Sequence, residues 1–93
     1  MPTLIVFHEV EDGGLWAKAW QSKGGSRHEM FARIGVTART FQDPETPEWT
    51  GLILDVPDMK QFQSFMESED VRRAMAEDGL KVNTMRTLSE FTP

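Results

Sequence analysis

The sequence predicts a single α+β domain, spanning residues 1–93, in which a four-stranded antiparallel sheet packs against helices. Its first strand segment, residues 3–10, is apolar on both faces. Leu4 and Val6 point to one side, and Ile5 and Phe7 point to the other. Continuous apolar runs of this kind are typical of strands that are covered on both sides. A chain this short supplies about one layer of helices, so we expect something else to cover the second face.

The segment that follows predicts a helical element over residues 12–34, in two parts. Asp12 can cap the first part, because its carboxylate can accept hydrogen bonds from the free N–H groups of a first helical turn. Gly24-Gly25 interrupts the helix, and Ser26 and Glu29 have the spacing of a capping box that starts the second part.

The second half of the chain begins with a predicted hairpin. Residues 36–41 and 49–56 have strand patterns, and the proline-rich loop between them leaves the register of their pairing open. Asp58 is placed to cap the next helix, which we expect to bend or restart at residues 68–70 and to end at Gly79.

Residues 80–91 predict the last strand, and the order is then strand, helix, strand, strand, helix, strand. This is the ferredoxin-like order, in which right-handed crossovers place both helical elements on one face of the sheet. The other face stays apolar and bare. A large apolar sheet face is expected to form an interface, and a second copy of the chain is the commonest solution.

Composition excludes several classes of function. The net charge is −5 and the basic residues are scattered, which disfavours a nucleic-acid-binding surface. Cysteine is absent, so disulfides, thiolate metal sites and thiol catalysis are excluded. Apolar runs are too short for a membrane span and resemble no signal peptide, so we expect a cytoplasmic protein. Charged runs such as Glu77-Asp78 are interpreted as solvated helix surface.

Short segments spread over most of the chain form a recognisable pattern: Phe7-His8-Glu9-Val10-Glu11-Asp12, Trp16, Val56-Pro57-Asp58, Phe65-Met66-Glu67-Ser68, Met75 and Gly79. Together they resemble the dimeric α/β-barrel superfamily, which includes proteins similar to antibiotic biosynthesis monooxygenases. The resemblance implies a homodimer whose two sheets face each other in a barrel. It also implies a ligand pocket between sheet and helices in each subunit.

His8 is the leading candidate for catalysis, since it lies within the first strand on the face of Leu4 and Val6. If this face looks toward the helices, the imidazole lies in the pocket, where it could act as a general base or bind a ligand. The alternative is a buried histidine that is satisfied by a carbonyl or carboxylate.

The other candidate ligand-binding residues are of two kinds. Aromatic and sulfur-containing side chains would wall an apolar pocket, or would only fill the core: Trp16, Trp20, Phe62, Phe65, Met66 and Met75. Arg39 and Arg86 lie in strands, where an unpaired charge is costly. Each could hold an anionic group of a ligand, or could pair with Asp55 or Glu90 at a sheet edge.

We predict no metal and no cofactor. His8 and His28 lack the spacing of a helical ligand pair such as His-x-x-x-His. The haem-degrading members of the superfamily carry an axial histidine on the last helix, a region that here offers Phe65 and Met75.

Three hypotheses on function follow. The first is a small homodimer that binds an apolar or aromatic small molecule between sheet and helices. The second is a cofactor-independent monooxygenase or isomerase that acts on an aromatic or polyketide-like metabolite, with His8 as general base and Arg39 or Arg86 holding substrate charge. The third is a module whose only partner is itself. Whether any reaction is catalysed stays open at this point.

Overall fold

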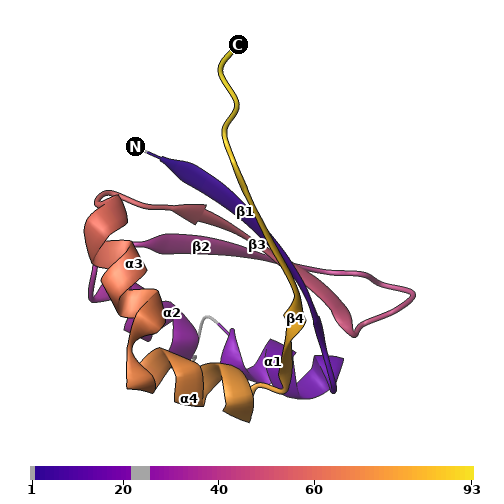
Figure 1. Cartoon of the computed structure of the whole chain (residues 1–93). Coiled ribbons are helices and arrows are strands. Elements are labelled where there is room, and N and C mark those ends of the chain that lie inside the picture. Colours follow the sequence, from indigo (N-terminus) through magenta and orange to yellow (C-terminus); the bar gives the residue numbers. More distant parts are fainter. Residues whose placement is uncertain (1, 22–25) are drawn as a thin grey trace.

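The structure is a computed structural model that describes residues 2–21 and 26–93. Within these residues, four strands form one antiparallel sheet in the order β2-β3-β1-β4. They are β1 (Thr3–Val10), β2 (Thr37–Gln42), β3 (Trp49–Asp55) and β4 (Leu80–Ser89). Four helices lie on one side of this sheet (Figure 1): α1 (Gly13–Ala19), α2 (Ser26–Ala32), α3 (Met59–Glu67) and α4 (Glu69–Glu77). The predicted α+β class and ferredoxin-like order are confirmed.

Strand β1 shows how the sheet separates its two faces. Leu4, Val6 and His8 are buried on the helix-covered side, whereas Ile5 and Phe7 are exposed on the other side. This is the alternation that the sequence predicts.

The β2–β3 register, which the sequence left open, places Arg39 opposite Ile53 and Thr37 opposite Asp55. Asp55 accepts a hydrogen bond from Thr3 of the neighbouring strand at 3.0 Å.

Side-chain caps begin the helices where the sequence predicts them. The Asp12 carboxylate accepts from the backbone N–H groups of Gly14 and Leu15 at 2.9 and 3.2 Å. Asp58 caps α3 in the same way. The predicted break at Gly24-Gly25 and the Ser26 side chain of the predicted capping box lie outside the described residues.

The long second helical element breaks in two at Ser68, as the sequence predicts. The Ser68 hydroxyl donates to the Phe65 carbonyl oxygen at 2.6 Å and accepts from the Val71 N–H at 3.3 Å, so this residue ends α3 and caps α4. Each half can therefore adopt its own angle over the sheet.

The last strand is shorter than predicted, because β4 ends at Ser89 rather than at Phe91. Ser89 lies opposite Leu4, near the start of β1, so residues 90–93 have no strand to pair with. The β1–β4 register also shifts between Phe7 and Glu9. None of the helices in the described ranges is long and apolar enough to cross a bilayer.

Candidate functional site

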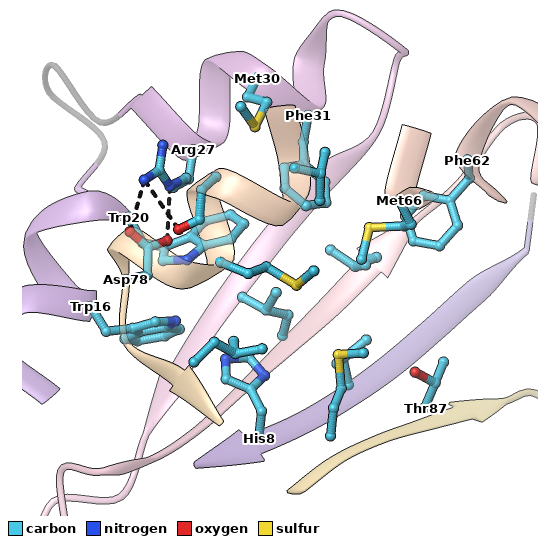
Figure 2. A pocket seen from close by; sticks show the side chains of 18 residues that line it. His8, Trp16, Trp20, Arg27, Met30, Phe31, Phe62, Met66, Asp78 and Thr87 are labelled. Carbon is cyan, nitrogen blue, oxygen red and sulfur yellow. Dashed lines mark hydrogen bonds and ion pairs between the residues drawn. The ribbon is translucent and has the colours of Figure 1, made fainter. Parts of the chain in front are cut away.

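A cavity of about 220 Å³ lies between the helix-covered face of the sheet and the helices (Figure 2). Most of its wall is apolar. The strands contribute Val6, His8, Leu52, Leu54, Met85 and Thr87. Helices α1 to α3 and their ends contribute Trp16, Trp20, Arg27, Met30, Phe31, Phe62 and Met66. Helix α4 and the turn into β4 add Val71, Ala74, Met75, Asp78 and Leu80.

His8 is placed in this cavity by the alternation of β1. Its side chain is only 2% exposed, and in Figure 2 its ring rises from the strand toward the helices. Neither ring nitrogen has a hydrogen-bond partner among the described residues. The sequence left open which way His8 faces, and the structure places it on the cavity side. The alternative of an imidazole satisfied by a carbonyl or carboxylate is not observed among the described residues.

The environment keeps the His8 imidazole neutral. Burial lowers the pKa of His8 to about 4, because an apolar surrounding disfavours the charged form. The negative charge of Asp78 opposes part of this shift. At pH 7 the ring consequently offers one N–H donor and one bare nitrogen acceptor.

Trp16 stands beside His8 at the same end of the cavity. Its ring centroid lies 5.9 Å from that of His8, with the two planes at 63°. Trp16 is 3% exposed, and its indole Nε1 also lacks a partner within the described residues. Trp20 packs one turn further along, 6.3 Å from the Trp16 ring. Both tryptophans line the cavity, where the sequence left open whether they wall a pocket or only fill the core, and Trp16 supplies an N–H donor without a partner among the described residues.

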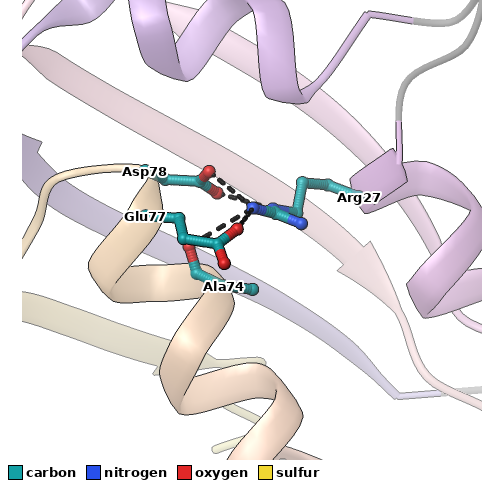
Figure 3. Close-up of polar contacts among 4 residues, drawn as sticks. All are labelled: Arg27, Ala74, Glu77 and Asp78. Carbon is teal, nitrogen blue, oxygen red and sulfur yellow. Dashed lines mark hydrogen bonds and ion pairs between the residues drawn. The ribbon is translucent and has the colours of Figure 1, made fainter.

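An ion pair joins α2 to the end of α4 at the cavity wall (Figure 3). The Arg27 guanidinium donates to both oxygens of Asp78, each at 2.8 Å, and to Glu77 at 3.3 Å. It also reaches the carbonyl oxygen of Ala74 at 3.5 Å. The hydrogen bond to Asp78 is the main cause that raises the pKa of Arg27 above its ordinary value.

The interpretation of Asp78 as solvated helix surface is therefore wrong, since this residue is only 7% exposed. No local pattern could have shown this. Asp78 follows a charged helix end, as an exposed residue would, and its partner Arg27 lies 51 positions earlier in the chain.

The remaining predicted wall residues fall into two groups. Phe62, Met66 and Met75 line the cavity. Phe65 instead packs edge-on against Phe31, with ring centroids 5.0 Å apart, and Phe31 forms the wall. Sequence reasoning assigned Phe31 to the apolar stripe of its helix without placing it in the pocket.

The two strand arginines lie away from the cavity. Arg39 is exposed, with its guanidinium carbon 5.5 Å from the Phe41 ring centroid. Arg86 is exposed as well and donates to the carbonyl oxygens of Asn83 and Met85. Among the described residues, neither arginine lines the cavity or forms an ion pair with a carboxylate. The predicted pairing with Asp55 or Glu90 is accordingly not observed.

Metal ligands do not gather around the cavity. Across residues 2–21 and 26–93, no three histidine or carboxylate side chains converge to hold a metal ion. His28 packs edge-on against Trp20, with ring centroids 5.2 Å apart.

The second surface of interest is the sheet face that no helix covers, which we call the open face. Large apolar side chains from all four strands are exposed on it: Ile5, Phe7, Phe41, Trp49 and Leu88. Arg39 and Arg86 lie on the outer strands of the same face, opposite Ile53 and Phe7 respectively.

Comparison with solved structures agrees with this architecture. A protein described as an antibiotic biosynthesis monooxygenase superposes with a TM-score of 0.68 at 11% sequence identity, over 100% of this chain and 99% of that chain. A proposed antibiotic biosynthesis monooxygenase from Nitrosomonas europaea gives 0.65 at 16% identity, over 99% and 98% of the two chains. The chain thus has the fold of antibiotic-biosynthesis-monooxygenase-like proteins, as the resemblance in the sequence implied. Neither protein-family models nor curated proteins match the sequence.

Proposed function

We propose that the protein is a homodimer that binds an apolar or aromatic small molecule in the cavity of each subunit. The cavity itself is the main support: it has apolar walls and a volume of about 220 Å³, and it contains polar atoms of His8 and Trp16 that have no hydrogen-bond partner among the described residues. Ligand sites are typically apolar pockets with a few convergent polar groups.

The proposal of a homodimer rests on the open face. Its two inner strands, β1 and β3, carry Phe7, Ile5 and Trp49, and their exposure to water is unfavourable. A two-fold arrangement of two sheets buries the same patch on both subunits. The arginines of the outer strands then lie near the rim, where charged side chains can stay in contact with water.

Binding is favoured over general-base catalysis by the state of His8. A general base works best with a pKa near the working pH, whereas burial lowers the pKa of His8 to about 4. The alternative, a cofactor-independent monooxygenase or isomerase, is supported by the names of the structural neighbours and by the position of His8 in the cavity. In that case Arg39 and Arg86 would act from outside the cavity, which makes a role in holding substrate charge difficult.

Ligand binding is tested with toluene and p-cresol as probes, by following amide chemical shifts in NMR titrations. The variant Ala74→Phe places a ring into the cavity from α4 and should abolish the binding of both probes. Ala76→Phe adds the same ring at an exposed position of the same helix and should leave binding intact. Absence of binding of either probe to the wild type would contradict the proposal.

The dimer is tested by sedimentation equilibrium. Phe7→Glu places a charge at the centre of the open face and should shift the protein to monomers. Leu15→Glu is the matched control, because Leu15 is equally exposed, at 47%, but lies on helix α1. A wild type that stays at 10.6 kDa at high concentration would rule the dimer out.

A further inference from the structure

The polar end of the cavity specifies which ligand chemistry it can recognise. Three buried atoms there have no partner among the described residues: Nδ1 and Nε2 of His8, and Nε1 of Trp16. Leaving such groups unsatisfied is costly, so a ligand that satisfies them gains affinity. Trp20 lines the same wall, and its nitrogen is not one of these atoms.

Donor and acceptor properties narrow the choice of ligand group. The indole N–H of Trp16 can only donate, and the neutral imidazole of His8 presents one acceptor nitrogen. The ring centroids lie 5.9 Å apart in an edge-to-face contact, so a single small ligand group at this end of the cavity can reach both side chains. A hydroxyl is both donor and acceptor and can therefore accept from Trp16 while it donates to His8.

The charges of the described wall residues disfavour anionic ligands. The positive charge of Arg27 is matched by Asp78 and Glu77, which it contacts at 2.8 and 3.3 Å. His8 is neutral at pH 7. A carboxylate or phenolate would therefore enter an apolar space in which none of the described wall residues offers an unmatched positive charge, and it would face the negative charge of Asp78.

Volume sets an upper limit on size. A cavity of about 150 Å³ takes up benzene, so roughly nine heavy atoms fit in 220 Å³. That is one ring with two or three substituent atoms, and it excludes three fused rings.

We infer that the cavity selects a neutral, single-ring compound whose hydroxyl group forms hydrogen bonds with the His8 imidazole and the Trp16 indole N–H. This inference rests on the proposed binding function and specifies its ligand class. It differs from the polyketide-like substrate considered for the sequence, because the ligand is smaller and is bound without a negative charge.

The test compares three ring compounds within this size limit at pH 7: toluene, p-cresol and benzoate. p-Cresol should bind at least about tenfold more tightly than toluene, since two buried hydrogen bonds are gained. Benzoate should bind at least about tenfold more weakly than p-cresol. A three-ring hydroxyl compound, 2-hydroxyanthracene, should not bind.

Variants of the two residues test whether His8 and Trp16 cause the preference for p-cresol. Trp16→Phe and His8→Phe keep a ring but remove the polar atoms, and each should reduce the preference for p-cresol over toluene. Trp20→Phe is the control and should change the affinity for both probes alike. In the wild type, the Trp16 indole N–H resonance should move downfield with p-cresol and not with toluene, which tests the contact without any substitution.

The outcomes separate this inference from the proposed function. If toluene and p-cresol bind equally well, the cavity binds ligands but the inference on the hydroxyl is wrong. A preference for p-cresol that survives both Trp16→Phe and His8→Phe, or tight binding of benzoate, overturns it as well. If neither toluene nor p-cresol binds, the proposed function itself fails, and the inference fails with it.

Discussion

The two faces of the sheet are built from the same strands, yet they have opposite environments. On β1, His8 is buried at 2% exposure while the neighbouring Phe7 is 47% exposed. A histidine is thus buried, and a phenylalanine faces outward. The difference shows that the arrangement of the helices, rather than the polarity of each residue, decides which positions are buried. The two proposals follow the same division, since the covered face holds the cavity and the open face carries the apolar side chains from which we propose a dimer interface.

The largest difference between the two faces is expected in the free energy of unfolding, when two adjacent residues of β3 are each replaced by alanine. Leu54→Ala removes a fully buried side chain from the helix-covered face and should lower the free energy of unfolding by about 3–4 kcal/mol. Ile53→Ala, on the open face, should cost about 1 kcal/mol or less in dilute protein. Urea unfolding measures both variants.

Protein concentration sharpens this comparison. The cost of Ile53→Ala should grow as the concentration rises, because the proposed dimer would bury the open face. The cost of Leu54→Ala should increase less. If both costs are independent of concentration, the open face is not an interface.

Breaking the ion pair between Arg27 and Asp78, on the covered side, should have the next largest effect on stability. Arg27→Met leaves the buried carboxylate of Asp78 without its cation and should destabilise the protein by about 3 kcal/mol. The control is Arg73→Met, which breaks the exposed pair with Glu69 on α4 and should change little. Thermal unfolding at pH 7 compares the two. An equal, small effect of both variants would show that burial does not strengthen the Arg27–Asp78 pair.

The pH dependence of stability should be the smallest of the three effects. The pKa of His8 is about 4 in the folded protein and near 6.5 when unfolded, so the unfolded state binds more protons between these values. The free energy of unfolding that depends on the neutral His8 is therefore at its full value above pH 6.5, and it decreases as the pH falls toward 4. The decrease should amount to roughly 2 kcal/mol between pH 8 and pH 5.

Two variants isolate this contribution. His8→Gln should remove the pH dependence that His8 causes, whereas His28→Gln, at the other histidine of the chain, serves as the control. Urea unfolding at a series of pH values measures the free energy of unfolding of the wild type and both variants. If wild type and His8→Gln have parallel pH profiles, His8 is not kept neutral by burial.

The fold could be predicted to a large extent because its signals are local. The Asp12 and Asp58 caps and the break at Ser68 depend on residues a few positions apart. The alternation of β1 likewise assigned His8 to the face of Leu4 and Val6. Strand ends were less accurate, as β4 shows, because pairing with β1 ends the strand and this depends on a distant segment.

The site could be predicted only in part. Trp16, Trp20 and Phe62 were expected in the pocket from their helical spacing, and they line it. Arg39 and Arg86 were also proposed to bind ligand, but strand alternation alone could not tell which face of β2 and β4 would meet the helices. Their placement on the open face follows from the pairing of these strands with β3 and β1.

The sequence by itself determined the order of the elements, the helix caps and the partition of each strand into two faces, because hydrogen-bonding partners and side-chain periodicity are encoded over a few residues. The tertiary structure alone decided that Arg27 meets Asp78 across 51 positions, and that His8 and Trp16 share one end of a cavity, where their ring nitrogens have no hydrogen-bond partner among the described residues. These features arise from packing between distant segments. Burial then changes the chemistry of the same side chains, and no local pattern records it.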